Sequence, residues 1–462
     1  MTALAAATPR STAADDAIAA ERDPLSLRAL RLLCIVAVAG IPLAMSWTGY
    51  ESFRIPKELL FRAIGLLALA LFTIVAVAPR VRAAVARLGR EAWLGAALVG
   101  WTIVSLLAST HRTNGLEALG TLLLGMAIFV AFLVIAERSG LSIVYWTYLP
   151  AAANITLFLL QRLAKWSPWG VPTDVPLLAS TSFLGNANDL GMTLLLPVLS
   201  AYALLRTERN RRRRMYAIAF AVYGTIGLVF SESVASIGGF AVGLWILLFL
   251  EARSWKKALR YSGLFVVAAI VAIAVVPRFR ERIRFGMNYV HQGRYNEIVS
   301  GRLVPSLVAI EMLRERPLTG YGPGSFRAEY FDHKLLVDQK YRSLLPEKMS
   351  EWSETRMLSF GETHDEHLQV ASELGLPGYV LFAAILVVIA RRTRRRRAQT
   401  RPRGEFGALL ALPAVVAFAV SVLAQFPLRL AAPLTTTLFV AAMIVAWTGN
   451  AEPENGEPEA SA

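Results

Sequence analysis

Long apolar runs separated by short polar segments dominate the pattern of this chain. A window of about 19 residues finds about twelve runs long enough to cross a hydrocarbon layer of about 30 Å. They lack the polar–apolar alternation of barrel strands, so helices are the structure that satisfies the backbone in lipid. We expect an all-α polytopic membrane protein with helices near 31–47, 59–78, 92–109, 116–136, 141–160, 190–205, 215–231, 234–250, 261–277, 370–390, 406–424 and 431–448.

Composition and charge refine this expectation. Hydrophobic residues make up 55% of the 462 positions and charged residues 18%, with a mean hydropathy of +0.48. The net charge is +15, but 23 Lys and Arg lie in the loops on one side and 6 in the short loops on the other. By the positive-inside rule, this bias places both termini in the cytoplasm. The arginine-rich run 391–403 then fits a topogenic loop beside anionic lipid better than a nucleic-acid site.

The chain divides into tails, membrane segments and one large loop. Residues 1–27 and 450–462 read as disordered cytoplasmic tails, because the first has no signal-peptide pattern and the second is acidic and rich in Pro and Gly. Helices one to nine are expected within 28–277 and helices ten to twelve within 370–449. The stretch 278–369 holds four of the five histidines and is expected to form a mainly helical periplasmic loop.

The first half of this loop predicts a helix followed by a glycine turn. Ser300 is expected to cap an amphipathic helix whose apolar face includes Leu303 and Leu307, with Glu311 on the polar face. Pro317 ends the helix. The glycines that follow either form a simple turn or bring backbone amides close to an anion, and they lie at positions 320, 322 and 324.

The second half runs into the tenth membrane helix as GETHDEHLQVASELGLPGYVLF (361–382). If this segment is helical from Thr363, His364 and His367 share one face beside Asp365 and Glu366. A second irregular segment, 165–189, joins helices five and six on the same side of the membrane. Its Pro, Gly and Asn content predicts a structured re-entrant or interfacial loop.

Four stretches, in order, resemble the O-antigen ligase and O-antigen polymerase superfamily, membrane enzymes that move glycans from undecaprenyl pyrophosphate. They are RIPKELLFR (54–62), FLGNANDLGMTLLLPVL (183–199), the helix and turn of 300–326, and HDEHLQVASELGLPGY (364–379). The ligase-type motif of a histidine, a small polar residue, nine positions and a glycine reads here as His364, Asp365 and Gly375. One departure is Val234, which stands where the family has an arginine, so another cation has to cover that charge.

The resemblance implies that His364 is the catalytic residue. An imidazole suits the base that takes the acceptor proton, and Arg302 suits the cation that stabilises the departing diphosphate. Alternatively, His364 and His367 only cap the tenth helix, and Arg302 only pairs with Glu297 or Glu311. The full set of expected substrate-binding residues is Arg302, His367, Glu366, Gly322, Gly324, Asn186, Asn188 and Lys57.

No metal site or other cofactor is expected. Cys34 is the single cysteine, and the histidine spacing around Glu366 does not match His-Glu-x-x-His. The resemblance implies a bacterial inner-membrane enzyme with an undecaprenyl-pyrophosphate-linked glycan donor and a lipid A-core or similar acceptor, in contact with membrane lipids and not nucleic acid. Transfer would be inverting.

Three alternatives stay open. A polymerase of the same fold would join repeat units to one another. A protein O-glycosylation enzyme would use Ser or Thr acceptors, although such relatives often carry an extra C-terminal domain that is not found after residue 449. A secondary transporter also fits the helix count, but no internal repeat relates 31–250 to 261–448, and transporters usually have one.

Overall fold

The computed structural model is helical throughout the part of the chain that it describes. That part comprises residues 24–46, 51–75, 77–168, 181–252, 254–257, 259–263, 266–267, 277–293, 295–299, 301–341, 360–394 and 402–449. No strand occurs within these residues. The expected all-α class is confirmed for them.

Seven of the described helical segments are long and apolar enough to cross a membrane. They are Leu25–Leu43 (α2, a π-helical turn and α3), Arg112–Arg138 (α7), Leu141–Leu163 (a 3-10 turn and α8, Tyr148–Leu163), Ala187–Thr207 (α9), Val234–Glu251 (α11), Glu366–Arg394 (α18, Glu366–Arg391, and a 3-10 turn) and Pro402–Ser421 (α19). The chain therefore has the build of a multi-pass membrane protein.

Four other expected spans also correspond to helices: α4 (Ile55–Phe72), α6 (Arg90–Leu107), α10 (Arg211–Phe230) and the shorter apolar α20 (Ala431–Trp447). The expected span 261–277 falls mostly outside the described residues, so the count of twelve stays a prediction. One boundary and one expected loop were wrong. The first helix already begins at Leu25, and a separate helix, α5 (Ala78–Leu88), forms where a loop was expected.

Local sequence signals explain where several helices begin. Pro56 lies in the first turn of α4, where its missing N–H costs nothing. The Asn210 side chain accepts the amide of Arg213 at 3.1 Å and so caps α10. Beyond these ends, apolar packing decides the arrangement: α11 and α9 pack on α19, and α20 packs on α7.

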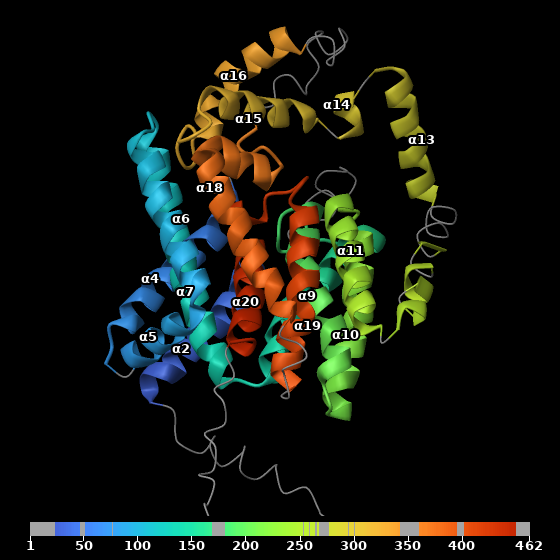
Figure 1. Cartoon of the computed structure of the whole chain (residues 1–462). Helices are drawn as coiled ribbons and strands as arrows, with labels where there is room; N and C mark the ends of the chain where they lie inside the picture. Colours follow the sequence, from blue (N-terminus) through green and yellow to red (C-terminus); the bar gives the residue numbers. More distant parts are fainter. Residues whose placement is uncertain are drawn as a thin grey trace, which may run out of the picture.

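The bundle has two distinct ends. At one end, α13 (Pro277–His291), α14 (Tyr295–Ile298), α15 (Leu303–Glu315) and α16 (Phe326–Lys340) form a loop module, in which α15 and α16 contact α18 (Figure 1). At the other end, Arg392 pairs with Glu91 at 2.7 Å and donates to Thr448 at 2.9 Å. The helix that starts the described chain and the helix that ends it both reach this opposite end (Figure 1).

The loop module has a core of its own. The apolar residues of α15 pack against α16, with Val308, Met312, Phe326 and Tyr330 fully buried. The described residues of this segment are thus mainly helical. The expected cap, Ser300, lies outside the described residues; the amide of Leu303 instead donates to the Asn296 side chain at 3.1 Å.

One expectation about this module was wrong. Glu311, placed on the polar face of α15, is 3% exposed. It is tolerated because Lys340 donates to it at 2.6 Å and Tyr341 and Arg314 at 2.5 Å each. Burial alone would raise the pKa of Glu311, but these three hydrogen bonds bring the pKa down to about 2.

Candidate functional site

The start of α18 is set by Asp365. The helix begins at Glu366 and not at Thr363, because the Asp365 carboxylate accepts the Leu368 amide at 3.1 Å as an N-cap. Asn and Ser cap helices as well as Asp does. The replacement of the usual residue by Asp is therefore mild in physical terms, and His364 lies outside the helix.

His364 and His367 do not share a face, contrary to the expectation, because the helix starts later. His364 has a left-handed backbone (φ +58), and its ring meets the rings of Phe360 and Phe426 edge-on at 5.6 and 4.7 Å. His367 donates from Nε2 to the Ala419 carbonyl at 3.2 Å. His367 thus connects α18 to α19, whereas His364 lies before the first residue of α18 and has non-helical backbone angles.

His364 lies within the electrostatic reach of Arg302. Burial, and then the positive charge of Arg302 just ahead of α15, lower the pKa of His364 from 6.5 to about 4. The imidazole is therefore neutral at pH 7 and able to accept a proton. Its pKa in the substrate-free protein is lower than the near-neutral value expected for a base.

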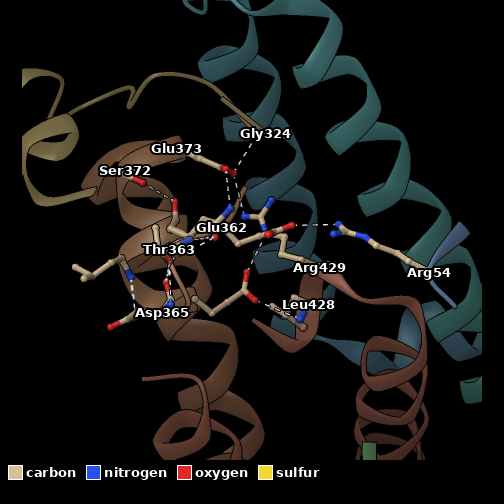
Figure 2. Close-up of polar contacts among 12 residues, drawn as sticks. Arg54, Gly324, Glu362, Thr363, Asp365, Ser372, Glu373, Leu428 and Arg429 are labelled. Carbon is tan, nitrogen blue, oxygen red and sulfur yellow. Dashed lines mark hydrogen bonds and ion pairs between the residues drawn. The ribbon is translucent and has the colours of Figure 1, made fainter. Parts of the chain in front are cut away.

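A buried ion cluster joins α18 to the connection between α19 and α20 (Figure 2). Arg429 donates from Nε to Glu366 at 3.1 Å and from Nη2 to Glu373 at 2.9 Å, and the two carboxylates are only 1% and 2% exposed. The amide of Leu428 donates to Glu366 at 3.2 Å, and Gln369 donates to Glu373 at 3.1 Å. Glu366, expected to bind substrate, is thus engaged inside the protein.

The glycine turn also faces this cluster. Gly322 donates its amide to the Glu373 carbonyl at 2.9 Å, and Gly324 donates to the Glu373 carboxylate at 3.0 Å. Tyr321, the residue before Gly322, donates its amide to the Ser372 carbonyl at 3.1 Å. Both glycine amides therefore have acceptors within the chain, which favours the turn-forming alternative over a phosphate cradle.

The glycine turn packs where α18 is broken, at Gly375 (φ 69, ψ −179). Carbonyls at the break lose their helical donors, and α6 supplies replacements. Trp101 donates to the Leu374 carbonyl at 2.7 Å, and Ser105 donates to the carbonyl before it at 3.1 Å. A Cβ at position 375 would lie 2.0 Å from the Leu318 carbonyl oxygen, so only glycine fits.

Lys57 is buried and hydrogen-bonded to backbone carbonyls, so its ammonium is not available to bind a phosphate. It is 5% exposed. Its ammonium donates to the carbonyls of Ala44 at 2.6 Å, Phe53 at 2.7 Å and Phe183 at 2.6 Å. Because an ammonium has three N–H donors, all of them are used. The expectation that Lys57 binds substrate finds no support in this geometry.

Asn186 and Asn188 lie at the start of α9. The Asn186 side chain accepts the amides of Asn188 and Asp189 at 2.7 and 3.0 Å, so Asn186 caps this helix. Both asparagine side chains are exposed at the end of the bundle that carries the loop module. The intervening loop that the sequence predicted, 165–189, lies outside the described residues from 169 to 180.

Three cations at this end had not been assigned a role from the sequence. Arg429 holds the ion cluster, Arg54 donates to Glu362 at 3.1 Å, and Arg162 pairs with Glu232 at 2.5 Å. Arg162 is thus the partner of Glu232, two residues before Val234. The available signal was that the sequence assigned each arginine to a short loop on the side of the membrane where the charge bias predicts few cations.

Comparison with known proteins agrees with the resemblance. No curated protein matches the chain. The family model described as O-antigen ligase matches residues 217–383, which run from α10 through the loop module and His364 to the second half of α18. The match supports the resemblance of this part of the chain to the O-antigen ligase/polymerase superfamily, a class of membrane enzymes that transfer glycans.

Proposed function

We propose that this protein is an O-antigen ligase-type glycosyltransferase that moves a glycan from undecaprenyl pyrophosphate to an acceptor hydroxyl, such as one on lipid A-core. The observation that supports the proposal is the neutral imidazole of His364, at one end of the helix bundle and within the matched family segment, with a pKa that the charge of Arg302 helps to lower. A base and a cation are the two groups that this reaction requires.

The chemistry divides between these two residues. The acceptor oxygen attacks the anomeric carbon as His364 takes its proton, and the bond from that carbon to the diphosphate oxygen breaks with its electrons going to the diphosphate. Arg302 stabilises the growing negative charge through paired N–H donors. A single displacement of this kind inverts the anomeric centre, and the proton leaves on His364.

Donor binding would strengthen the base. The bound diphosphate offsets the positive charge of Arg302, which is one of the two causes that lower the pKa of His364. The pKa therefore rises when the donor is in place, toward the range in which an imidazole is an effective base.

The charge bias supports a topology for this reaction. We propose that the bundle end with the loop module faces the periplasm of the inner membrane and that both termini are cytoplasmic. Arginines at the opposite end, such as Arg392, fit the positive-inside rule. The donor would then arrive attached to lipid, since nucleotide sugars are absent from the periplasm.

The dependence of rate on pH tests the roles of His364 and Arg302. We expect kcat/KM to stay level from pH 7 down to about 5 and to fall as the pH drops through about 4. Arg302→Gln removes a positive neighbour, so the acidic limb should move to higher pH as well as the rate falling. An acidic limb that stays at the same pH in Arg302→Gln would contradict the assignment.

The stability of the folded protein should depend on pH through the same histidine. The free energy of unfolding should decrease as pH falls from 6.5 to about 4, because only the unfolded chain then protonates His364.

Gene loss in the native host distinguishes ligase from polymerase, which stays an alternative because Val234 replaces the family arginine. Loss of a ligase should leave a bare lipid A-core while undecaprenyl-linked polymer accumulates. Single repeat units on the core would indicate a polymerase. Unchanged surface glycan and unchanged lipid-linked intermediates would contradict both and leave transport to be tested.

A further inference from the structure

We infer that Arg429, which lies outside the matched family segment, is a positioning residue for His364 and acts through the buried side chains of Glu366, Gln369 and Glu373. This inference rests on the proposed function. Arg429 belongs to the connection between α19 and α20, about sixty residues after His364 in the chain. Its guanidinium is directed at the two glutamates, as Figure 2 shows.

The backbone at His364 needs external support. A φ of +58 is unfavourable for a residue with a Cβ and persists only where neighbours enforce it. The residue before it, Thr363, is fully buried; its amide donates to the Gln369 side chain at 3.0 Å, and its hydroxyl donates to the Asp365 carbonyl. The chain is thus fixed on both sides of the imidazole.

A continuous network connects these two sides. Gln369 accepts from Thr363 and donates to Glu373 at 3.1 Å; Glu373 accepts from Arg429 at 2.9 Å; and Arg429 donates to Glu366 at 3.1 Å. It therefore starts at the residue before His364 and ends two residues after it. Figure 2 shows the side chains of this network between the start of α18 and the α19–α20 connection.

The α19–α20 connection also touches the imidazole itself. Phe426 meets the His364 ring at 4.7 Å, and Gln425 is anchored to α11 by hydrogen bonds with Ser233 at 2.5 Å and Ser236 at 3.0 Å. The amide of Glu366 donates to the Val422 carbonyl at 3.0 Å, which adds a backbone link. One anchored segment thus carries both the ring contact and the guanidinium.

The buried charge cluster is better explained by a role in holding side chains in one position than by a contribution to the stability of the fold. Burying a charge cluster costs solvation, and well-packed apolar residues of similar size are often as stable. Every carboxylate oxygen of Glu366 and Glu373 nevertheless has a donor: Arg429 and Leu428 for the first, and Arg429, Gly324 and Gln369 for the second. Fully satisfied buried polar networks hold one arrangement rigidly.

Two variants of the full-length protein test the inference. Arg429→Lys keeps the charge but cannot bridge both glutamates in the same way. The triple variant Arg429→Met, Glu366→Gln, Glu373→Gln removes the whole charge cluster, so no buried charge is left unpaired and the fold is spared. Gln292→Ala, an exposed position on the loop module, serves as the control.

We expect both variants to reach the membrane at normal abundance with kcat reduced by about 10²-fold in the triple variant, the size expected for a misplaced catalytic group. KM for the lipid-linked donor should change little. The acidic limb of kcat/KM should rise from about 4 toward 6.5, because His364 would lose its burial and its approach to Arg302.

Unchanged kcat and an unchanged acidic limb in either folded variant would overturn the inference. If the triple variant does not accumulate in the membrane, the kcat and the acidic limb of Arg429→Lys provide the test. The result also separates this inference from the proposed function: full activity of His364→Ala would defeat both, whereas an inactive His364→Ala with a normal Arg429→Lys would defeat the positioning role alone.

Discussion

His364→Ala is expected to lower the rate of glycan transfer by about 10² to 10⁴-fold, the contribution typical of a general base. The side chain is half-buried beside the rings of Phe360 and Phe426 and lies outside α18, so its loss should change the proton transfer more than the fold. The measurement is transfer from a lipid-linked donor to an acceptor by the purified protein in lipid vesicles, at saturating donor.

A matched control separates catalysis from folding. His291 lies exposed at the end of α13 in the same loop module, so His291→Ala should behave as the wild type. Equal abundance of the two variants in the membrane would show that the fold is intact. If His364→Ala retained more than about a tenth of the wild-type rate, another group would have to be the base.

Gly375→Ala is expected to destabilise the protein by about 4 kcal/mol or more, which places it among the most damaging single substitutions. The residue has φ 69 and ψ −179, a region that is essentially restricted to glycine. A Cβ there would lie 2.0 Å from the carbonyl oxygen of Leu318 and 2.4 Å from its carbon. Both neighbours are backbone atoms, so no side chain can move aside. Thermal unfolding in detergent would measure the loss.

Gly100→Ala provides the opposite case. Gly100 lies inside α6, and nothing lies within 4 Å of the position that its Cβ would take. The same substitution should therefore be neutral or stabilise by up to about 1 kcal/mol, since alanine has less freedom in the unfolded chain. Equal effects at positions 100 and 375 would show that the break in α18 is not a fixed feature.

The elements that were predictable from sequence are those set by local patterns. Apolar runs identified eleven segments that the structure describes as helices, and the helix, turn and histidine pattern indicated which residues surround the site. Arg302 and His364 are separated by about sixty positions in the chain, and the positive charge of Arg302 nevertheless contributes to the lowered pKa of His364.

The errors came from tertiary contacts, which periodicity does not report. Lys57 was expected to bind substrate as part of the family-like stretch 54–62, but the carbonyls of Ala44, Phe53 and Phe183 accept hydrogen bonds from it. Glu311 was assigned to solvent by its place on the helix, but α16 brings Lys340 and Tyr341 over it. In both cases, partners far away in the sequence determine that the charged side chain is buried.

The start of α18 was missed for a different reason. Thr363 and Asp365 are both good N-cap residues, and sequence alone does not say which of them caps the helix. The structure selects Asp365, because Thr363 is occupied with Gln369. That choice of two residues moves His364 from a helical face to a strained position beside an aromatic ring.

The break in α18 has a consequence for how a lipid substrate would reach this protein. A straight helix of 26 residues would be about 39 Å long, which exceeds a hydrocarbon layer of about 30 Å. Under the proposed function, the portion ahead of the break at Gly375, about 13 Å long, would lie at the depth of the lipid headgroups. Under the proposed function, a carrier could keep its isoprenoid tail among the acyl chains and arrive by lateral diffusion. Its phosphates would then meet the protein without being lifted out of the bilayer.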